Sequence, residues 1–390
     1  MKSIVELRFA IFAGTCHCEQ SEAISIRAMD FTVHHARDCR GPSGLPMTFR
    51  KDPHRYTLAI DNRWSIADYW SMINDEHQTV NGKMVLILGV TASGKGRLGF
   101  ELAQSIGAEI ISIDSMKVYR RMDIGTAKPP REARERIKHH LVDVAEPSDS
   151  FSVGTFFDAA SDAIEQMKNC KKNIVAIGGT ALYIKALLYG LFEGAGSDEQ
   201  LRDELRARAQ AEGLAELHRE LTTVDAIAAE RINPNDARRI VRALEVYRIT
   251  GKPISSFQKQ WERRQMKHDW TIIGLRRGRA DASSLINKRV KKMINAGLVD
   301  EVKSLLDEEK PLSRQARCAI GYAEIIDHLN GQTSLEDATE LMKAHTRRLA
   351  KGQRTWFRTF RDVHWLDLEA DEPGERIFER AKALLSCRRQ

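Results

Sequence analysis

Long hydrophobic runs and cysteines are both scarce in this chain of 390 residues. No apolar run approaches the roughly 20 residues that a transmembrane helix needs, so the sequence predicts no membrane span. The six cysteines are too few and too scattered for a disulfide framework. A reducing cytosol is therefore the expected compartment, and the protein is predicted to be cytoplasmic.

Residues 1–83 show no sustained hydrophobic period. We interpret them as an extension that is disordered or that reflects a mis-assigned translation start, with the functional protein beginning near Met72 or Met84. A small accessory module is the alternative. Cysteines and histidines in this extension form a weak metal-binding pattern, for which unpaired thiols are the simpler interpretation: Cys16, His17, Cys18, His34, His35 and Cys39.

Basic residues outnumber acidic residues in only one part of the chain. The formal net charge is +7, but residues 1–83 carry ten basic and ten acidic residues, so the whole excess lies in residues 84–390. This distribution favours a polyanionic partner, with charge that serves only solubility as the alternative.

Residues 84–95 combine an apolar strand sequence with the pattern G-x-x-x-x-G-K, which is typical of phosphate-binding loops. Glycines let successive backbone N–H groups point at phosphate oxygens, and the following helix adds its positive dipole end. A lysine at the end of the pattern reaches the terminal phosphates as a mobile charge. We therefore predict phosphate binding by Gly89, Val90, Thr91, Ala92, Ser93, Gly94, Lys95 and Gly96.

The phosphate loop lacks the hydroxyl that normally follows its lysine. A Ser or Thr at this position ligates Mg²⁺, whereas this chain has Gly96. The backbone cradle and Lys95 do not depend on that hydroxyl. Three consequences stay open: a water fills the gap, metal affinity falls, or the ancestral reaction is lost.

Strand and helix patterns alternate after Met84, which predicts an α/β fold: a P-loop NTPase-like parallel sheet with helices on both faces. The expected strands are 85–89, 109–114, 140–144, 174–177 and 270–275, and the expected helices are 97–106, 153–167, 181–189, 283–307 and 335–360. Residues 198–231 are charged and helical in pattern, without a strand, and predict a helical insertion. The catalytic core would then comprise residues 84–197 and 232–390.

Two further strand ends carry polar residues. Asp114 ends the strand at 109–114, and Thr180 follows Gly178 and Gly179. Because ligands of such sheets bind at the carboxyl ends of the strands, we expect Asp114 to share a crevice with the phosphate loop. The alternatives are a turn cap for Asp114 and a helix cap for Thr180. The paired glycines suggest close approach by a substrate.

Basic residues are concentrated in two helical segments. Arg239 and Arg242 are three residues apart and project from one helix face, where they could neutralise an anionic leaving group or lie in solvent. Residues 343–361 contain seven Lys or Arg, no acid, and Trp356, Phe357 and Phe360. This pattern favours contact with single-stranded RNA, with a core helix that has one wet face as the alternative.

Together these segments resemble the tRNA dimethylallyltransferase (tRNA isopentenyltransferase) family. The matches are co-linear, span nearly all of residues 84–367, and are far more specific than the phosphate loop alone. Besides that loop they comprise Asp114–Arg120, Met122–Pro129, His140–Asp143, Gly178–Tyr183, Asn235–Val246, Gly297–Val302, Ala319–Tyr322 and Thr346–Phe357.

The resemblance implies transfer of a dimethylallyl group from its diphosphate to the exocyclic amine of the adenosine 3′ of the anticodon in tRNA. It also implies Mg²⁺ as cofactor and the tRNA anticodon stem-loop as partner, gripped in part by the insertion at 198–231. We expect a monomer.

The resemblance also assigns roles to individual residues. Asp114 is expected to be the general base, with Lys95, Thr180 and Arg239 as further catalytic residues. Arg242 is expected to join the phosphate loop in binding the diphosphate. The residues expected to contact tRNA are Asp114, Ser115, Met116, Lys117, Arg239, Lys351, Gln353, Arg354 and Trp356.

Several positions depart from the family pattern: Gly96, Lys117 for Gln, Ser283 and Leu285 for Tyr and Arg, and Gly352 within Lys-Arg-Gln. They support a competing interpretation as a non-catalytic RNA-binding homologue. A P-loop small-molecule kinase and an enzyme that prenylates free adenine nucleotides also compete with the tRNA-modifying activity. We favour that activity because Lys95, Asp114, Thr180 and Arg239 are all present.

Overall fold

The computed structural model describes residues 39–40, 46–52, 55–60, 82–191, 196–257 and 266–386. The chain divides into two compact units, residues 1–80 and residues 81–390, which we describe separately. Among the described residues, the helices are too short or too polar to cross a membrane.

The first unit contains an antiparallel sheet of three strands, β1 (Cys39–Arg40), β2 (Pro46–Asp52) and β3 (Arg55–Ile60). Strands β2 and β3 pair from Asp52 opposite Arg55 to Met47 opposite Ile60. The aperiodic sequence predicts no strand here, so this sheet is a difference between expectation and structure. Met72 lies outside the described residues. So do most of the residues of the weak metal-binding pattern: Cys16, His17, Cys18, His34 and His35.

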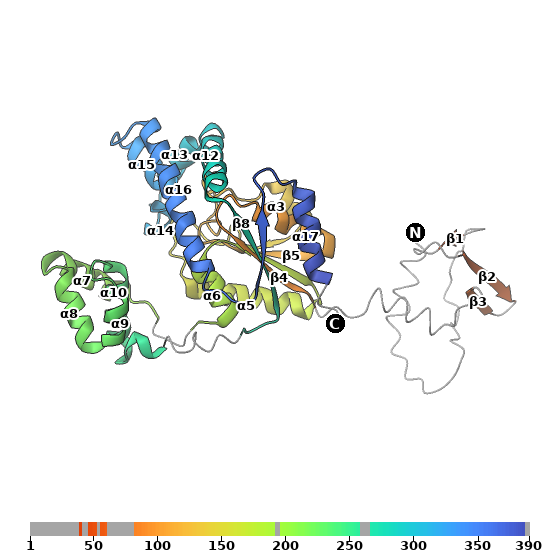
Figure 1. The fold of residues 1–390 in the computed structure, drawn as a ribbon, viewed down its shortest axis with the longest axis horizontal. Helices are drawn as coiled ribbons and strands as arrows, with labels where there is room; N and C mark the ends of the chain where they lie inside the picture. Colours follow the sequence, from red (N-terminus) through yellow and green to blue (C-terminus); the bar gives the residue numbers. More distant parts are fainter. Residues whose placement is uncertain are drawn as a thin grey trace. The chain divides into compact units, whose positions relative to one another are not determined.

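The second unit is built on a six-stranded parallel sheet, as the alternating pattern predicts (Figure 1). The strand order is β6-β5-β7-β4-β8-β9, which puts the strand of the phosphate loop near the centre. The strands are β4 (Met84–Gly89), β5 (Ala108–Ile113), β6 (His139–His140), β7 (Asn173–Gly178), β8 (Trp270–Arg277) and β9 (Val363–Leu368). Strand β9 is not among the strands expected from sequence.

Helices cover both faces of this sheet because side chains alternate along each strand. Val85 and Ile87 join one hydrophobic cluster with α3 and α17. Leu86 and Leu88 join the other, with α5, α6, α12, α13, α15 and α16. Their bounds are α3 (Lys95–Ile106), α5 (Val153–Asn169), α6 (Ala181–Tyr189), α12 (Arg279–Asn295), α13 (Leu298–Leu306), α15 (Tyr322–Leu329), α16 (Leu335–Phe357) and α17 (Gly374–Ser386).

The long helix predicted at 283–307 is two helices, α12 and α13. Gly297 separates them with a φ of 95°, a left-handed conformation that glycine adopts without a steric penalty. Two short helices, α4 (Arg131–Arg136) and α14 (Arg314–Arg317), complete the part built on the sheet.

The helical insertion has a hydrophobic core of its own. Its helices are α7 (Glu199–Ala211), α8 (Leu214–Val224), α9 (Ala226–Arg231) and α10 (Ala237–Thr250). Ile240 and Leu244 of α10 are fully buried in the same cluster as Leu205 and Leu217. The insertion therefore extends past residue 231, the boundary expected from sequence, because the apolar face of α10 packs on the other helices and not on the sheet.

Candidate active site

The strand order places three predicted site segments at adjacent strand ends. Strand β7 lies between β5 and β4 in the parallel sheet. Asp114 directly follows β5, Thr180 lies two residues after the end of β7, and the phosphate loop follows β4. These segments therefore lie at one edge of the sheet, where the sequence predicts a shared crevice.

The phosphate loop curls as the glycine pattern predicts. Ala92 and Gly94 have φ values of 61° and 94°, and the Ser93 amide donates to the Val90 carbonyl at 3.2 Å. Helix α3 begins without a side-chain cap and has no acidic residue in its first turn. Its first N–H groups therefore lack an internal partner and can bind an anion.

Gly96 occupies open space in the first turn of α3. A Cβ built on this residue has no atom within 4 Å. The structure therefore gives no steric reason for glycine where the pattern has Ser or Thr.

Asp114 makes the turn contacts that the cap interpretation predicts. Its Oδ1 accepts the amides of Met116 at 2.9 Å and Lys117 at 3.3 Å. Within the described part of the chain, Oδ2 accepts no hydrogen bond from the protein, so one carboxylate oxygen is available to a ligand. The turn role and a catalytic role are thus compatible.

Thr180 links two strand ends and does not cap its own helix. Helix α6 lacks a side-chain cap, and the Thr180 hydroxyl instead accepts the amide of Ser115 at 3.2 Å. This bond fixes the segment after β7 to the residue that follows Asp114.

The two glycines before Thr180 make room for the protein itself. A Cβ on Gly178 would lie 2.1 Å from the Ile113 carbonyl oxygen, and a Cβ on Gly179 would lie 2.6 Å from Gln353 Nε2. The expectation that these glycines admit a substrate is corrected: neighbouring backbone and the Gln353 side chain occupy that space.

Three cations surround Asp114 at this sheet edge. Burial, followed by the charges of Lys117 and Arg289, lowers the pKa of Lys95 to about 7, while Asp114 acts in the opposite direction. Burial also lowers the pKa of Lys117 and the pKa of Arg289, and Asp114 raises both. Lys95 donates to the Val90 carbonyl at 3.2 Å. A site in which half-buried cations outnumber the neighbouring carboxylate favours a polyanionic ligand.

The structure assigns Arg239 and Arg242 to the helical insertion. Arg239 is exposed and pairs with Asp236 at 3.4 Å, one turn earlier in the chain. Arg242 donates to the buried Glu245 at 2.7 Å and to the Gly196 carbonyl at 3.0 Å. Both arginines thus contact residues of the insertion or next to it, whereas Arg289 of α12 lowers the pKa of Lys95 and is itself influenced by Asp114.

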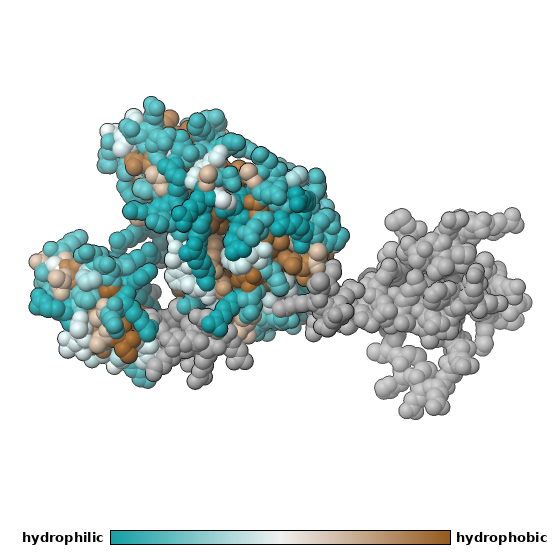
Figure 2. Space-filling model, viewed as in Figure 1, coloured by the Kyte–Doolittle hydropathy of each residue, from teal (hydrophilic) through white to brown (hydrophobic). Residues whose placement is uncertain are grey.

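One face of helix α16 packs in the hydrophobic core, and the opposite face is exposed to solvent. Phe357 and Phe360 are buried in the hydrophobic core, as the core-helix alternative predicts. Lys351 is exposed, Arg354 is partly exposed, and Trp356 is 37% exposed. The face on which α16 is visible is mostly hydrophilic (Figure 2). Exposed cations and one exposed aromatic ring thus occur together on this helix.

Gln353 differs from its neighbours on α16 because it is buried. Its Oε1 accepts the amide of Thr91 at 2.8 Å, and its Nε2 donates to the Gly179 carbonyl at 2.9 Å. Sequence reasoning missed these contacts and the place of Arg289. Both residues lie on helices remote in sequence from the strand ends, so no local spacing indicates their neighbours.

The described residues contain no cluster of three or more His, Cys, Asp or Glu side chains that could hold a metal ion. At the strand ends, Asp114 is the carboxylate that acts on Lys95, Lys117 and Arg289. This donor set fits Mg²⁺ bound mainly by substrate phosphates, because Mg²⁺ commonly takes only one or two protein carboxylates.

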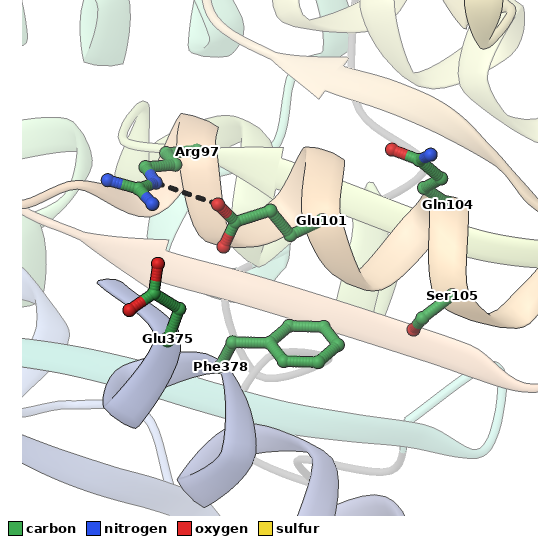
Figure 3. A pocket seen from close by; sticks show the side chains of 6 residues that line it. All are labelled: Arg97, Glu101, Gln104, Ser105, Glu375 and Phe378. Carbon is green, nitrogen blue, oxygen red and sulfur yellow. Dashed lines mark hydrogen bonds and ion pairs between the residues drawn. The ribbon is translucent and has the colours of Figure 1, made fainter. Parts of the chain in front are cut away.

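An open pocket is lined by none of the residues predicted for the site (Figure 3). Within it Arg97 is paired with Glu101 at 2.7 Å, and Glu375 lies near Arg97. Its two carboxylates outnumber its one cation, so unlike the strand ends it offers no excess of positive charge. It lies between α3 and α17 and is lined by Arg97, Glu101, Gln104, Ser105, Glu375 and Phe378.

Comparison with known proteins gives consistent matches. The family described as IPP transferase matches residues 117–360. A tRNA dimethylallyltransferase of Geobacter metallireducens is 44% identical over 285 residues, which cover 73% of this chain and 92% of the relative.

Two solved structures extend the comparison. The full-length tRNA isopentenylpyrophosphate transferase of Bacillus halodurans is 37% identical with a TM-score of 0.58, over 78% of this chain and 96% of that chain. A eukaryotic dimethylallyltransferase acting on tRNA is 27% identical with a TM-score of 0.65, over 79% and 81% of the two chains.

Proposed function

We propose, because this chain belongs to the IPP transferase family, that it transfers a dimethylallyl group from dimethylallyl diphosphate to the exocyclic amine of the adenosine 3′ of the anticodon in tRNA. One observation carries this proposal: an uncapped helix N-terminus and three cations lie beside a carboxylate at adjacent strand ends. The donor diphosphate and the acceptor amine need these two kinds of group.

The cationic side of the site stabilises the leaving group. As the amine nitrogen forms a bond to the allylic carbon, the bond from that carbon to oxygen breaks and diphosphate departs with the electron pair. Lys95, Arg289 and Lys117, together with the first N–H groups of α3, absorb the charge that develops on it. The role expected of Arg239 and Arg242 is thereby assigned to Arg289 in this proposal.

Asp114 acts on the acceptor. The lone pair of an adenine amine is delocalised, so the amine is a poor nucleophile unless an acceptor orients it and removes its proton. The Oδ2 atom is available for this role, while Oδ1 is held by the amides of Met116 and Lys117. Thr180 keeps this turn in place through Ser115.

Mg²⁺ would be held mainly by the diphosphate oxygens, with Asp114 as the carboxylate at the same edge. When bound it would supply further positive charge to the leaving diphosphate. The absence of a hydroxyl at Gly96 leaves more of that neutralisation to Lys95, Lys117 and Arg289.

The tRNA contacts are proposed on α16 and the helical insertion. Lys351, Arg354 and Trp356 combine phosphate-binding charge with a ring on which a base can stack. The target base must leave its stack to reach Asp114, which is the general requirement for enzymes that modify a base. We place the protein in the cytoplasm, acting on tRNA as a monomer.

The test is product formation by the full chain with dimethylallyl diphosphate, Mg²⁺ and tRNA. Asp114→Asn keeps an Oδ1 acceptor for the turn but removes the base, and we expect product formation to fall about 10²–10⁴-fold. Binding of tRNA should stay nearly unchanged, and Asp114→Ala should also lose product. Asp158→Ala, an exposed change on α5, is the control.

The remaining outcomes identify the competing functions. ATP consumption without prenylated tRNA would indicate a kinase, and tRNA binding without product would indicate an RNA-binding protein. Prenylation of free AMP in place of tRNA would indicate the nucleotide-modifying enzyme. Each of these results would overturn the proposal.

A further inference from the structure

Gln353 joins segments of the site that are far apart in the sequence. Its side-chain oxygen accepts the Thr91 amide of the phosphate loop, 262 positions away, and its side-chain nitrogen donates to the Gly179 carbonyl after β7. Both bonds have good lengths, 2.8 and 2.9 Å, and the second is buried. Both ends of the amide are therefore engaged within the protein.

The contacts of Gln353 continue towards the general base. Gly179 is followed by Thr180, whose hydroxyl accepts the Ser115 amide at 3.2 Å. Ser115 follows Asp114 directly, and the Gly179 amide also donates to the Ile113 carbonyl at 3.3 Å. The side chain of Gln353 is thus the bridge between the diphosphate loop and the segment that holds Asp114.

The packing around this bridge is tight. The space beside Gly179 is filled by Gln353 Nε2, and Lys95 Cε lies 3.6 Å from the position of a Gly179 Cβ. A change in the length or chemistry of the Gln353 side chain would alter the spacing between Thr91 and Gly179, and so the position of the loop relative to Lys95.

We propose that Gln353 is a positioning residue that sets the phosphate loop and the Asp114 turn at the spacing the transfer needs, in place of the direct tRNA contact expected from sequence. This inference rests on the proposed function and adds a positioning role for Gln353 to it. Gln353 stands on α16 between the exposed Lys351 and the partly exposed Arg354, so the helix that carries these cations is joined to the phosphate loop.

The first test compares Gln353→Ala with Lys351→Ala and with Gln166→Ala, an exposed helical control on α5. For Gln353→Ala we expect binding of inorganic pyrophosphate, measured by calorimetry, to weaken about tenfold, and kcat/KM for dimethylallyl diphosphate to fall about 10²-fold. Affinity for tRNA should stay within about twofold of the wild type. Lys351→Ala should show the reverse pattern, because it removes a phosphate contact.

The second test uses the close approach of Gly179. Gly179→Ala alone forces Gln353 to move and should lower kcat/KM for dimethylallyl diphosphate about as much as Gln353→Ala. In the double variant the clashing atom is gone, so the second change should add little, and the two effects should be strongly non-additive. Gln353→Glu should fail to restore activity, because a carboxylate cannot donate to the Gly179 carbonyl.

The outcomes separate this inference from the proposed function. If the wild type makes no prenylated tRNA, the proposed function fails, and pyrophosphate binding by Gln353→Ala still tests the bridge. The inference is overturned if Gln353→Ala binds pyrophosphate as tightly as Gln166→Ala, if it loses tRNA affinity instead, or if the two effects with Gly179→Ala simply add. Thermal unfolding of each variant shows whether the fold is kept.

Discussion

The helical insertion and the strand-end site both contain basic residues, but the surroundings of these residues differ. In the insertion, Arg206 pairs with Glu199 and Asp203, and Arg208 pairs with Glu212 and Glu220. These pairs raise the pKa of both arginines. At the sheet edge, burial and neighbouring cations instead lower the pKa of Lys95 to about 7.

This difference indicates which cations can gain from binding an anionic ligand. A cation that already has a carboxylate partner at the surface contributes about 0–1 kcal/mol to stability and gains little from a new anion. At the sheet edge, by contrast, three half-buried cations share the carboxylate of Asp114, and their partial desolvation is costly to the protein until an anion arrives. On this basis we expect Lys95, Lys117 and Arg289 to bind the ligand, and we group Arg239 with the paired arginines of the insertion.

Among changes to these cations, the largest expected effect separates Arg289 from Arg239. We expect Arg289→Ala to lower kcat/KM for dimethylallyl diphosphate about 10²–10³-fold, because it removes charge that stabilises the leaving group. Arg239→Ala should change it about fivefold or less, since Arg239 is exposed and paired with Asp236. Steady-state kinetics with both variants measures the difference. A larger loss for Arg239→Ala would contradict the distinction between the two arginines and support the catalytic role expected of Arg239 from the sequence.

A smaller effect concerns the protonation of Lys95. In the free protein its pKa is about 7, so above this pH the side chain is largely neutral. A bound diphosphate favours the ammonium, so binding at pH 8 should take up a proton. Calorimetry with inorganic pyrophosphate in buffers of different ionisation enthalpy measures this uptake. Lys95→Arg, which stays charged, should show less uptake, and equal uptake would contradict the shifted pKa.

The same shift has a defined sign for stability. Between the folded pKa of about 7 and the ordinary value of 10.5, the unfolded chain binds more protons at Lys95 than the folded protein does. Stability therefore rises with pH across this window through Lys95 alone. Below pH 7 the charged, partly desolvated Lys95 side chain opposes folding.

The smallest expected effect is that of Gly96→Ser. The added side chain enters open space, so we expect an unchanged fold and a lower Mg²⁺ concentration for half-maximal activity, by about threefold, if a hydroxyl at this position ligates the metal. Activity titrated with Mg²⁺ gives the value, with Gly96→Ala as the matched control. An unchanged Mg²⁺ profile would show that the lost hydroxyl is irrelevant here and that the cations carry the charge.

Local patterns predicted the elements that form from nearby residues. The apolar strand before Gly89 and the glycine pattern after it yield β4 and the curled loop, and helix α6 begins and ends as expected at Ala181 and Tyr189. The break at Gly297 was missed because the helical pattern continues on both sides, and only its positive φ separates α12 from α13.

The sequence by itself determined the parallel α/β sheet, the phosphate loop and the candidate carboxylate at Asp114, because strand periodicity, glycine conformation and strand-end position are local properties. Only the tertiary structure decided which distant residues meet them. Packing of α12 and α16 on the sheet brings Arg289 and Gln353 to the strand ends, while the apolar face of α10 keeps Arg239 in the insertion. Contacts between helices and strands so far apart in sequence form because apolar faces are buried against each other. No residue spacing within the sequence indicates which distant residues these faces bring together.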